Sequence, residues 1–160
     1  MSGAGAPTGA ETEAVDGTGL KVTIVAGRWH DVIAEGLLAG AHRVLDASGA
    51  EVTEVRVPGS FELPVVCKAA LEAGADAVVA LGVIIRGGTP HFDFVSNAAT
   101  DGLTRVALDT GKPVGFGVLT LDDEAQGLDR AGLPGSHEDK GAEAASAALE
   151  AAVLLRGLRG

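Results

Sequence analysis

Hydrophobic and polar residues follow two different spacings along the chain, and one of them predicts four strands. Leu20–Ala26 begins with apolar and polar residues in alternation and then becomes fully apolar, as a half-buried strand does. Ala77–Ile85 is apolar throughout, which is typical of a central parallel strand that is buried on both faces. Similar patterns predict strands at Glu51–Val57 and Val114–Thr120.

The segments between these strands have the apolar spacing of helices. The first predicted helix runs from Asp31, which can cap its start, to Ser48, and Gly49 follows its end. A second helix is predicted at Pro64–Ala73, and a third starts with the cap Thr89 and the first-turn Pro90 and runs towards Leu108. A short helix is predicted from Asp122 or Asp123 to near Gly132. The last helix starts with a capping box at Ser136–Asp139 and runs to about Leu158. This order predicts an α/β fold, a three-layer sandwich in which a central four-stranded parallel sheet carries helices on both faces.

Composition adds domain boundaries and excludes some classes of partner. The 160 residues suit one domain, which we expect over 19–160, after a flexible arm at 1–18 that has almost no bulky apolar residues. A net charge of −10 without a basic patch argues against nucleic acid, and no apolar run is long enough for a membrane helix. The N-terminus has no pattern of a secretory signal, so we expect a cytoplasmic protein. The single cysteine, Cys67, is expected to pack as a small hydrophobe.

Aromatic residues make up only 3 % of the chain, and most of them are predicted to lie at one edge of the sheet. Trp29, Phe61 and Phe92 follow the ends of predicted strands, and Phe116 lies within the fourth strand. Because parallel sheets bind ligands beyond the carboxyl ends of their strands, we expect a stacking site for a flat ligand there, with Glu62 as its carboxylate. The alternatives are that Trp29 only covers the sheet end and that Glu62 is a solvated first-turn acid.

Other residues in the same region favour a ligand that carries phosphate. Gly87, Gly88 and Thr89 precede a helix start, where free backbone N–H groups can bind phosphate, although an ordinary tight turn also explains them. His91 follows, in a first turn whose dipole disfavours the imidazolium and leaves an imidazole able to exchange protons; it can also be a plain helix-start residue. Arg130 can bind phosphate or complement the end of a short helix. The four histidines lack metal-ligand spacing, so no metal is expected.

Five segments together resemble the lumazine synthase family in order and spacing. They are VPGSFELP (57–64), ALGVIIRGGTPHFDFV (80–95), GVLT (117–120), LDRAG (128–132) and DKGAEAA (139–145), and the similarity extends from about Leu20 to the C-terminus. The resemblance implies a flavodoxin-like subunit that condenses 5-amino-6-(D-ribitylamino)uracil with 3,4-dihydroxy-2-butanone 4-phosphate in riboflavin biosynthesis. The products are 6,7-dimethyl-8-ribityllumazine, phosphate and water, and no cofactor is implied.

The same resemblance implies roles for individual residues. Binding of the pyrimidine ring and its ribityl chain is assigned to Trp29, Ser60, Phe61, Glu62, Val83, Ile84, Ile85, Phe116 and Lys140, with Phe116 supplied by a neighbouring subunit. Phosphate binding is assigned to Gly88, Thr89 and Arg130, and proton transfer to His91. This chain departs from the family pattern at Leu121–Gly127 and at Gly88, where family members commonly carry a side chain.

Assembly and alternative functions are also expectations at this point. Family members form pentamers, some of which build capsids; the loop Leu133–Asp139 is long for a capsid former, so we expect a free homopentamer with sites between subunits. The alternatives are a related riboflavin synthase, a non-catalytic flavin- or lumazine-binding protein on the same scaffold, and a structural shell protein. His91 and Arg130 together favour the enzyme, because a protein that only binds the ring needs no phosphate site.

Overall fold

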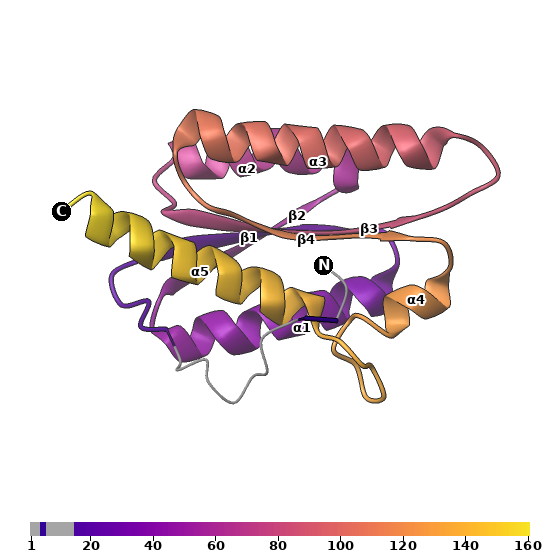
Figure 1. Cartoon of the computed structure of the whole chain (residues 1–160), viewed down its shortest axis with the longest axis horizontal. Helices are drawn as coiled ribbons and strands as arrows, with labels where there is room; N and C mark the ends of the chain where they lie inside the picture. The colour runs from indigo at the N-terminus through magenta and orange to yellow at the C-terminus, as the bar shows by residue number, and fades with distance from the viewer. Residues whose placement is uncertain (1–3, 6–14) are drawn as a thin grey trace.

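Strands and helices alternate along most of the chain (Figure 1). The computed structural model describes residues 4–5 and 15–160. In chain order its elements are β1 (Lys21–Gly27), α1 (Asp31–Ser48), β2 (Glu51–Val57), the 3-10 helix η1 (Ser60–Glu62), α2 (Leu63–Glu72), β3 (Ala77–Ile85), α3 (His91–Thr110), β4 (Val114–Leu121), α4 (Glu124–Leu128) and α5 (Lys140–Leu158).

The four strands form one parallel sheet in the order β2-β1-β3-β4. Helices α2 and α3 pack together on one face of this sheet, and α1, α5 and the short α4 lie on the other (Figure 1). The predicted α/β three-layer sandwich with a central four-stranded parallel sheet, consistent with a flavodoxin-like fold, is therefore confirmed. Strand order reverses between β1 and β3, so the carboxyl ends of these two strands border the crevice in which such sheets bind ligands.

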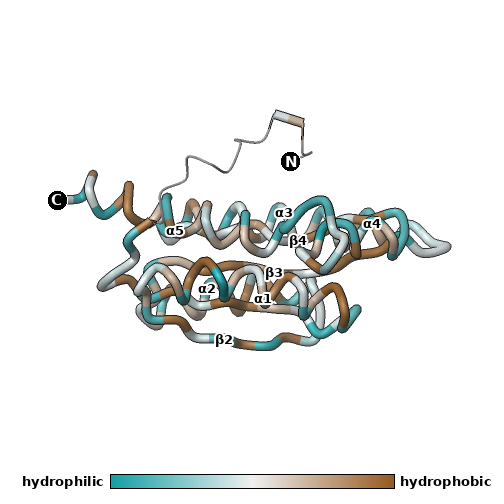
Figure 2. The backbone as a smooth tube through the Cα atoms, turned by 90° about the horizontal axis from the view of Figure 1, so that it is seen from below, coloured by the Kyte–Doolittle hydropathy of each residue, from teal (hydrophilic) through white to brown (hydrophobic). Residues whose placement is uncertain are grey.

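The core consists of two apolar clusters, one on each face of the sheet. Side chains of β3 alternate between them, since Val79 and Leu81 belong to the cluster under α1 and α5 whereas Val78 and Ala80 belong to the one under α2 and α3. All five aromatic side chains stay at least partly exposed, so the core is built from aliphatic residues. Strand β2 is the half-exposed edge of the sheet, and polar and apolar residues alternate along it (Figure 2).

Glycine allows the helices of one layer to approach closely. At Gly141, in the first turn of α5, an added β-carbon would overlap the carbonyl oxygen of Leu37 in α1. The two backbones therefore meet without an intervening side chain, which holds the start of α5 and the loop before it against α1.

Several predicted helix starts are wrong by a few residues. Asp31 is the first residue of α1 and not its cap; His30 occupies the cap position, and its side chain makes no capping hydrogen bond. Helix α3 begins at His91, so Pro90 stands at the cap position that Thr89 was expected to fill. The helix after β4 was expected to start at Asp122 or Asp123 and to end near Gly132. Asp123 caps it, and it ends at Leu128.

The capping box expected at Ser136–Asp139 is also wrong. Asp139 itself caps α5, because its carboxylate accepts a hydrogen bond from the backbone N–H of Ala142 at 3.0 Å. The Ser136 hydroxyl is used inside the preceding turn, where it accepts from the Leu133 N–H and donates to the Leu128 carbonyl oxygen. A side chain that closes its own turn cannot also cap the helix that follows.

Most of the arm predicted at 1–18 lies outside the described residues. Of the remainder, Gly17 donates its N–H to the Ser48 carbonyl oxygen at 2.8 Å, and Arg156 donates to the Thr18 carbonyl oxygen at 3.1 Å. The described end of this segment is thus tied to α1 and α5. Cys67 is buried in α2 as expected, and burial raises the pKa of its thiol to about 12, which leaves it a packing residue.

Candidate active site

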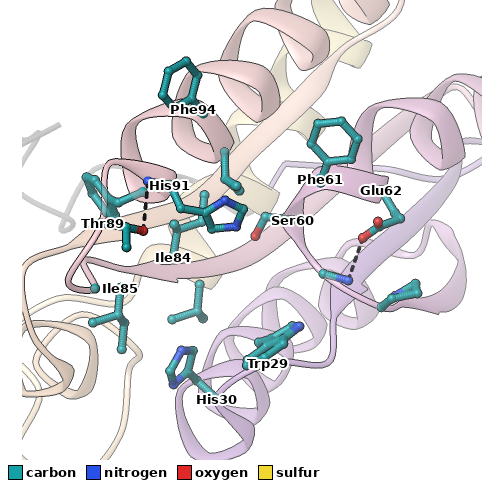
Figure 3. A pocket seen from close by; sticks show the side chains of 16 residues that line it. Trp29, His30, Ser60, Phe61, Glu62, Ile84, Ile85, Thr89, His91 and Phe94 are labelled. Atoms are coloured by element: carbon teal, nitrogen blue, oxygen red, sulfur yellow. Dashed lines mark hydrogen bonds between the residues drawn. The ribbon is translucent and has the colours of Figure 1, made fainter.

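A cavity of about 690 Å³ lies at the carboxyl ends of β1, β2 and β3, at the reversal of strand order (Figure 3). Three short segments and the start of α3 form its wall. The lining residues are Trp29, His30, Pro58, Gly59, Ser60, Phe61, Glu62, Val83, Ile84, Ile85, Gly87, Thr89, His91, Phe92, Phe94 and Val95. Nine of the residues assigned from the sequence are therefore brought together: Trp29, Ser60, Phe61, Glu62, Val83, Ile84, Ile85, Thr89 and His91.

Trp29 presents its indole ring to this cavity from the segment after β1. The neighbouring Arg28 N–H donates to the Val57 carbonyl oxygen at 3.0 Å, which fixes this segment beside the end of β2. Gly59 lies against the ring, since an added β-carbon there would come within 3.2 Å of Trp29 Cδ1. Trp29 is 67 % exposed, and an open aromatic face in a cavity suits a flat ligand.

The segment after β2 supplies a carboxylate whose position is fixed by the backbone. The Gly59 N–H donates to Glu62 Oε2 at 3.0 Å, so this carboxylate closes the turn that it belongs to. Glu62 is thus a first-turn acid, as one alternative had it, but it is half-buried and bonded to its own turn. Ser60 is buried beside it and rests against Gly82 of β3, where any larger residue would overlap the Ser60 hydroxyl.

The end of β3 and the start of α3 form the opposite wall. His91 is exposed as the first residue of α3, and its backbone N–H donates weakly to Thr89 Oγ1 at 3.4 Å. Gly87 and Gly88 precede it with open space around both backbones, so a ligand atom can approach the N–H groups of this loop. In Figure 3 the His91 ring points into the cavity towards Ser60.

Arg86 stabilises the loop between β3 and α3 and does not line the cavity. Its Nε is 3.1 Å from Asp122 Oδ1, its Nη1 is 3.7 Å from Asp93 Oδ1, and its guanidinium lies 4.2 Å from the centre of the Phe92 ring. The ion pair with Asp122 joins the ends of β3 and β4, and the stacked Phe92 forms part of the cavity wall. Arg86 therefore holds the loop in shape while other groups face a ligand.

Four assigned residues do not line this cavity: Gly88, Phe116, Arg130 and Lys140. Gly88 stands between the lining residues Gly87 and Thr89. Phe116 pairs with Ala80 in the middle of the sheet, well before the carboxyl end of β3, and its side chain is 49 % exposed on the edge strand β4. The other two belong to a separate cluster.

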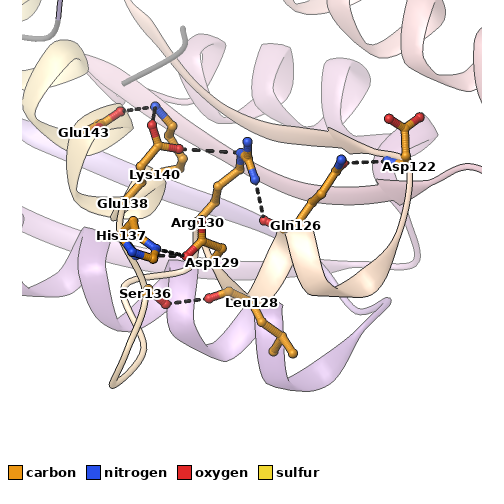
Figure 4. Close-up of polar contacts among 10 residues, drawn as sticks. All are labelled: Asp122, Gln126, Leu128, Asp129, Arg130, Ser136, His137, Glu138, Lys140 and Glu143. Carbon is orange, nitrogen blue, oxygen red and sulfur yellow. Dashed lines mark hydrogen bonds and ion pairs between the residues drawn. The ribbon is translucent and has the colours of Figure 1, made fainter. Parts of the chain in front are cut away.

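Arg130 and Lys140 meet around the carboxylate of Glu138 (Figure 4). The Glu138 side chain is only 17 % exposed and lies 3.5 Å from Arg130 Nε and 3.6 Å from Lys140 Nζ. Arg130 Nη1 also donates to the Gln126 carbonyl oxygen at 2.9 Å, so the interpretation that it complements the end of a short helix is correct. Lys140 pairs in addition with Glu143 at 2.8 Å. Glu138 thus holds the two cationic side chains in a fixed geometry, and the carboxylates of Glu138 and Glu143 balance their charges.

The loop that carries this cluster is tied down by His137 and Asp129, whose side chains are 2.5 Å apart. This hydrogen bond raises the pKa of His137 and lowers the pKa of Asp129. The contact is therefore strongest between the lowered pKa of Asp129 and the ordinary pKa of histidine, and it weakens as pH rises through the raised pKa of His137 or falls through that of Asp129.

Several site residues escaped the sequence analysis. Phe94 and Val95 lie on the cavity side of α3, three and four positions after His91, and this helical spacing could have revealed them. His30, Pro58 and Gly59 follow strands just as the assigned residues do. Glu138 could not be identified from the sequence, because its pairing with Arg130 and Lys140 depends on how the loop around it folds.

Within residues 4–5 and 15–160, no three His, Cys, Asp or Glu side chains gather as metal ligands would. None of the described helices is both long enough and apolar enough to cross a bilayer.

Comparison with known proteins places this geometry in a family. Residues 19–156 match the family model of 6,7-dimethyl-8-ribityllumazine synthase. A relative of that name from Leifsonia xyli subsp. xyli is 79 % identical, with all of both chains covered, and one from Clavibacter sepedonicus is 73 % identical over 100 % of this chain and 99 % of its own. A third, from Streptomyces avermitilis, is 57 % identical over 98 % of this chain and 96 % of its own. The chain is thus a member of the 6,7-dimethyl-8-ribityllumazine synthase family, enzymes of riboflavin biosynthesis.

Proposed function

We propose that this protein makes 6,7-dimethyl-8-ribityllumazine in sites that two neighbouring subunits of a homopentamer share. The reaction condenses 5-amino-6-(D-ribitylamino)uracil with 3,4-dihydroxy-2-butanone 4-phosphate and releases phosphate and water. The observation that carries this proposal is a cavity of about 690 Å³ in which an exposed indole, a fixed carboxylate and the His91 imidazole converge. Membership of an enzyme family supports catalysis, and no comparison favours a non-catalytic flavin- or lumazine-binding protein.

The pyrimidine half of the site is proposed to lie against Trp29. The exposed indole offers a face for stacking, and the side chains of Val83, Ile84 and Ile85 close the apolar side of the cavity. Glu62 and Ser60 lie beside the ribityl chain in this arrangement. A carboxylate with one oxygen held by the Gly59 N–H accepts hydrogen bonds from sugar hydroxyls at little entropic cost, because it is already oriented.

The phosphate half is proposed to lie at Gly88 and Thr89, where the loop before α3 presents backbone N–H groups at a helix start. His91 is next to this loop and inside the cavity. It is thus positioned to move protons during imine formation between the 5-amino group and the ketone, during loss of phosphate and during ring closure. None of these steps requires a metal or an organic cofactor.

The remaining assigned residues support a site completed by a second copy of the chain. Arg130 and Lys140 are held in place by Glu138 outside the cavity of their own subunit, and Phe116 lies half-exposed on an edge strand. The cavity supplies few cations for a phosphate, since Arg86 is engaged with Asp122 and Phe92. We infer that a neighbour supplies Arg130 to the phosphate, and Phe116 and Lys140 to the pyrimidine side. A free homopentamer in the cytoplasm is part of this proposal.

Complementation between two impaired variants, assayed at a keto-phosphate concentration well below the KM of Arg130→Ala, tests the shared site. Co-expression of His91→Ala and Arg130→Ala chains, with different affinity tags and tandem purification, gives mixed oligomers. If the two residues come from different subunits, random mixing leaves about a quarter of the sites with both groups intact, because each site takes one face from each neighbour. Lumazine formation is therefore expected to return in the mixed oligomers, well above either variant alone.

The matched control is co-expression of His91→Ala with Trp29→Ala. Both residues line the same cavity of one subunit, so every mixed site still lacks one of them and activity stays low. Rescue in this control as well, or no rescue in the first mixture, would contradict a site shared as proposed.

A further inference from the structure

His30 has an unusual backbone conformation beside the cavity. Its φ of 60° and ψ of 70° lie in the left-handed region, and it is the only residue other than glycine with a positive φ in the described part of the chain. A β-carbon makes this conformation costly, and glycine or asparagine adopts it more easily. Histidine is one of the residues enriched in this region, and a left-handed residue beside a cavity points to a functional role for its ring.

The left-handed turn places two neighbouring rings in one cavity. Consecutive side chains of an extended segment point to opposite sides, yet Trp29 and His30 both line the same wall, with ring centroids 6.3 Å apart and planes tilted by 46°. The backbone of His30 serves α1 in an ordinary way, since its carbonyl oxygen accepts from the Ala34 N–H at 2.9 Å. Its imidazole makes no capping hydrogen bond, so helix formation does not explain the ring.

The His30 ring lies on the half of the cavity opposite Glu62. In Figure 3 it stands below Ile85, on the same side as Thr89, whereas Phe61 and Glu62 lie across the cavity beyond Trp29. It also borders a smaller hollow of about 450 Å³ with Arg28, Asp31 and Pro58, so it remains accessible to solvent. The ring therefore lines the same cavity as Thr89 and His91, to which the proposed function assigns the keto-phosphate.

We propose that His30 binds the phosphate-bearing substrate, by donating an imidazole N–H hydrogen bond to its oxygen atoms, and thereby contributes to selectivity for that substrate. This inference rests on the proposed function and assigns a second imidazole to the site, across the cavity from His91. The left-handed backbone at His30 is what turns this donor inward while Trp29 keeps its stacking face.

The test uses two variants that differ in what they retain. His30→Gly removes both the ring and the unfavourable conformation, whereas His30→Asn keeps a side-chain N–H of shorter reach in a residue that tolerates the left-handed region. For His30→Gly we expect the KM for the keto-phosphate to rise about tenfold, as for loss of a hydrogen bond to a charged group. The KM for the pyrimidine is expected to change by less than about twofold. His30→Asn is expected to fall between wild type and His30→Gly.

Inhibition by inorganic phosphate and thermal unfolding complete the test. The inhibition constant of phosphate is expected to rise in parallel with the KM for the keto-phosphate, and the Tm of both variants to be equal to or above that of wild type. An unchanged KM with a raised Tm would show a strained helix start without a ligand role and overturn the proposal. An equal rise in both KM values would also overturn it, because the ring would then act by supporting Trp29. A wild-type protein that forms no lumazine would instead contradict the proposed function itself.

Discussion

Replacing His91 by alanine is expected to lower kcat about a hundredfold or more, as for loss of a general acid–base group. His91 is exposed at the first position of α3 and lines the cavity, so its imidazole can reach a bound ligand. The pyrimidine contacts of Trp29, Glu62 and the end of β3 are untouched by the change, so pyrimidine affinity is expected to stay within about twofold of wild type. Steady-state kinetics and a pyrimidine titration measure the two quantities.

His42→Ala is the matched control, because it removes another partly exposed imidazole that lies outside the cavity. His42 joins α1 to β2 through a 2.8 Å contact with Glu54, which raises the pKa of the imidazole. Its loss is expected to affect stability below the ordinary histidine pKa, an effect that fades as pH rises through the raised value, and to leave kcat unchanged. An unaltered kcat in His91→Ala would remove His91 from the reaction.

Arg130→Ala is expected to raise the KM for the keto-phosphate by about ten- to a hundredfold, the range for a lost hydrogen bond to a charged group. Glu138 and the Gln126 carbonyl oxygen hold the guanidinium in place before any substrate arrives, so little entropy is lost when it binds phosphate. The KM for the pyrimidine is expected to change much less. Initial rates with each substrate varied in turn give both values.

Arg105→Ala provides the comparison for loss of an arginine elsewhere. Arg105 is 82 % exposed on α3 and pairs with Asp109 one turn away, as surface arginines commonly do. Its removal is expected to leave both KM values at the wild-type level. Equal weakening of both substrates by Arg130→Ala would mean that Arg130 supports the site as a whole, contrary to a phosphate-binding role.

The sequence predicted the sheet well because burial on two faces leaves a strong local signal. In β3 almost every side chain is buried in one cluster or the other, which is why its sequence is the continuous apolar run typical of a central strand. Helix starts were predicted less well, since they depend on which polar side chain accepts hydrogen bonds from the free backbone N–H groups of the first turn. Ser136 and Asp139 are both suitable caps, and only the folded turn shows that Ser136 is used elsewhere.

The sequence predicted which residues lie together where each of them follows a strand, and it missed residues whose position depends on the fold around them. Trp29, Glu62 and His91 converge because parallel strands end at the same edge, which the order of elements already implies. The left-handed conformation of His30 and the position of Glu138 between two cations leave no pattern in the sequence. Phe116, Arg130 and Lys140 lie outside the cavity of one chain, and their assignment to a neighbour's site stays a prediction.

The most direct test of the proposed reaction is to supply the purified protein with both substrates and record lumazine absorbance and released phosphate together. The account predicts that both appear at equal rates, in proportion to protein concentration, and without added metal or cofactor. Binding of the pyrimidine without formation of lumazine or release of phosphate would contradict it.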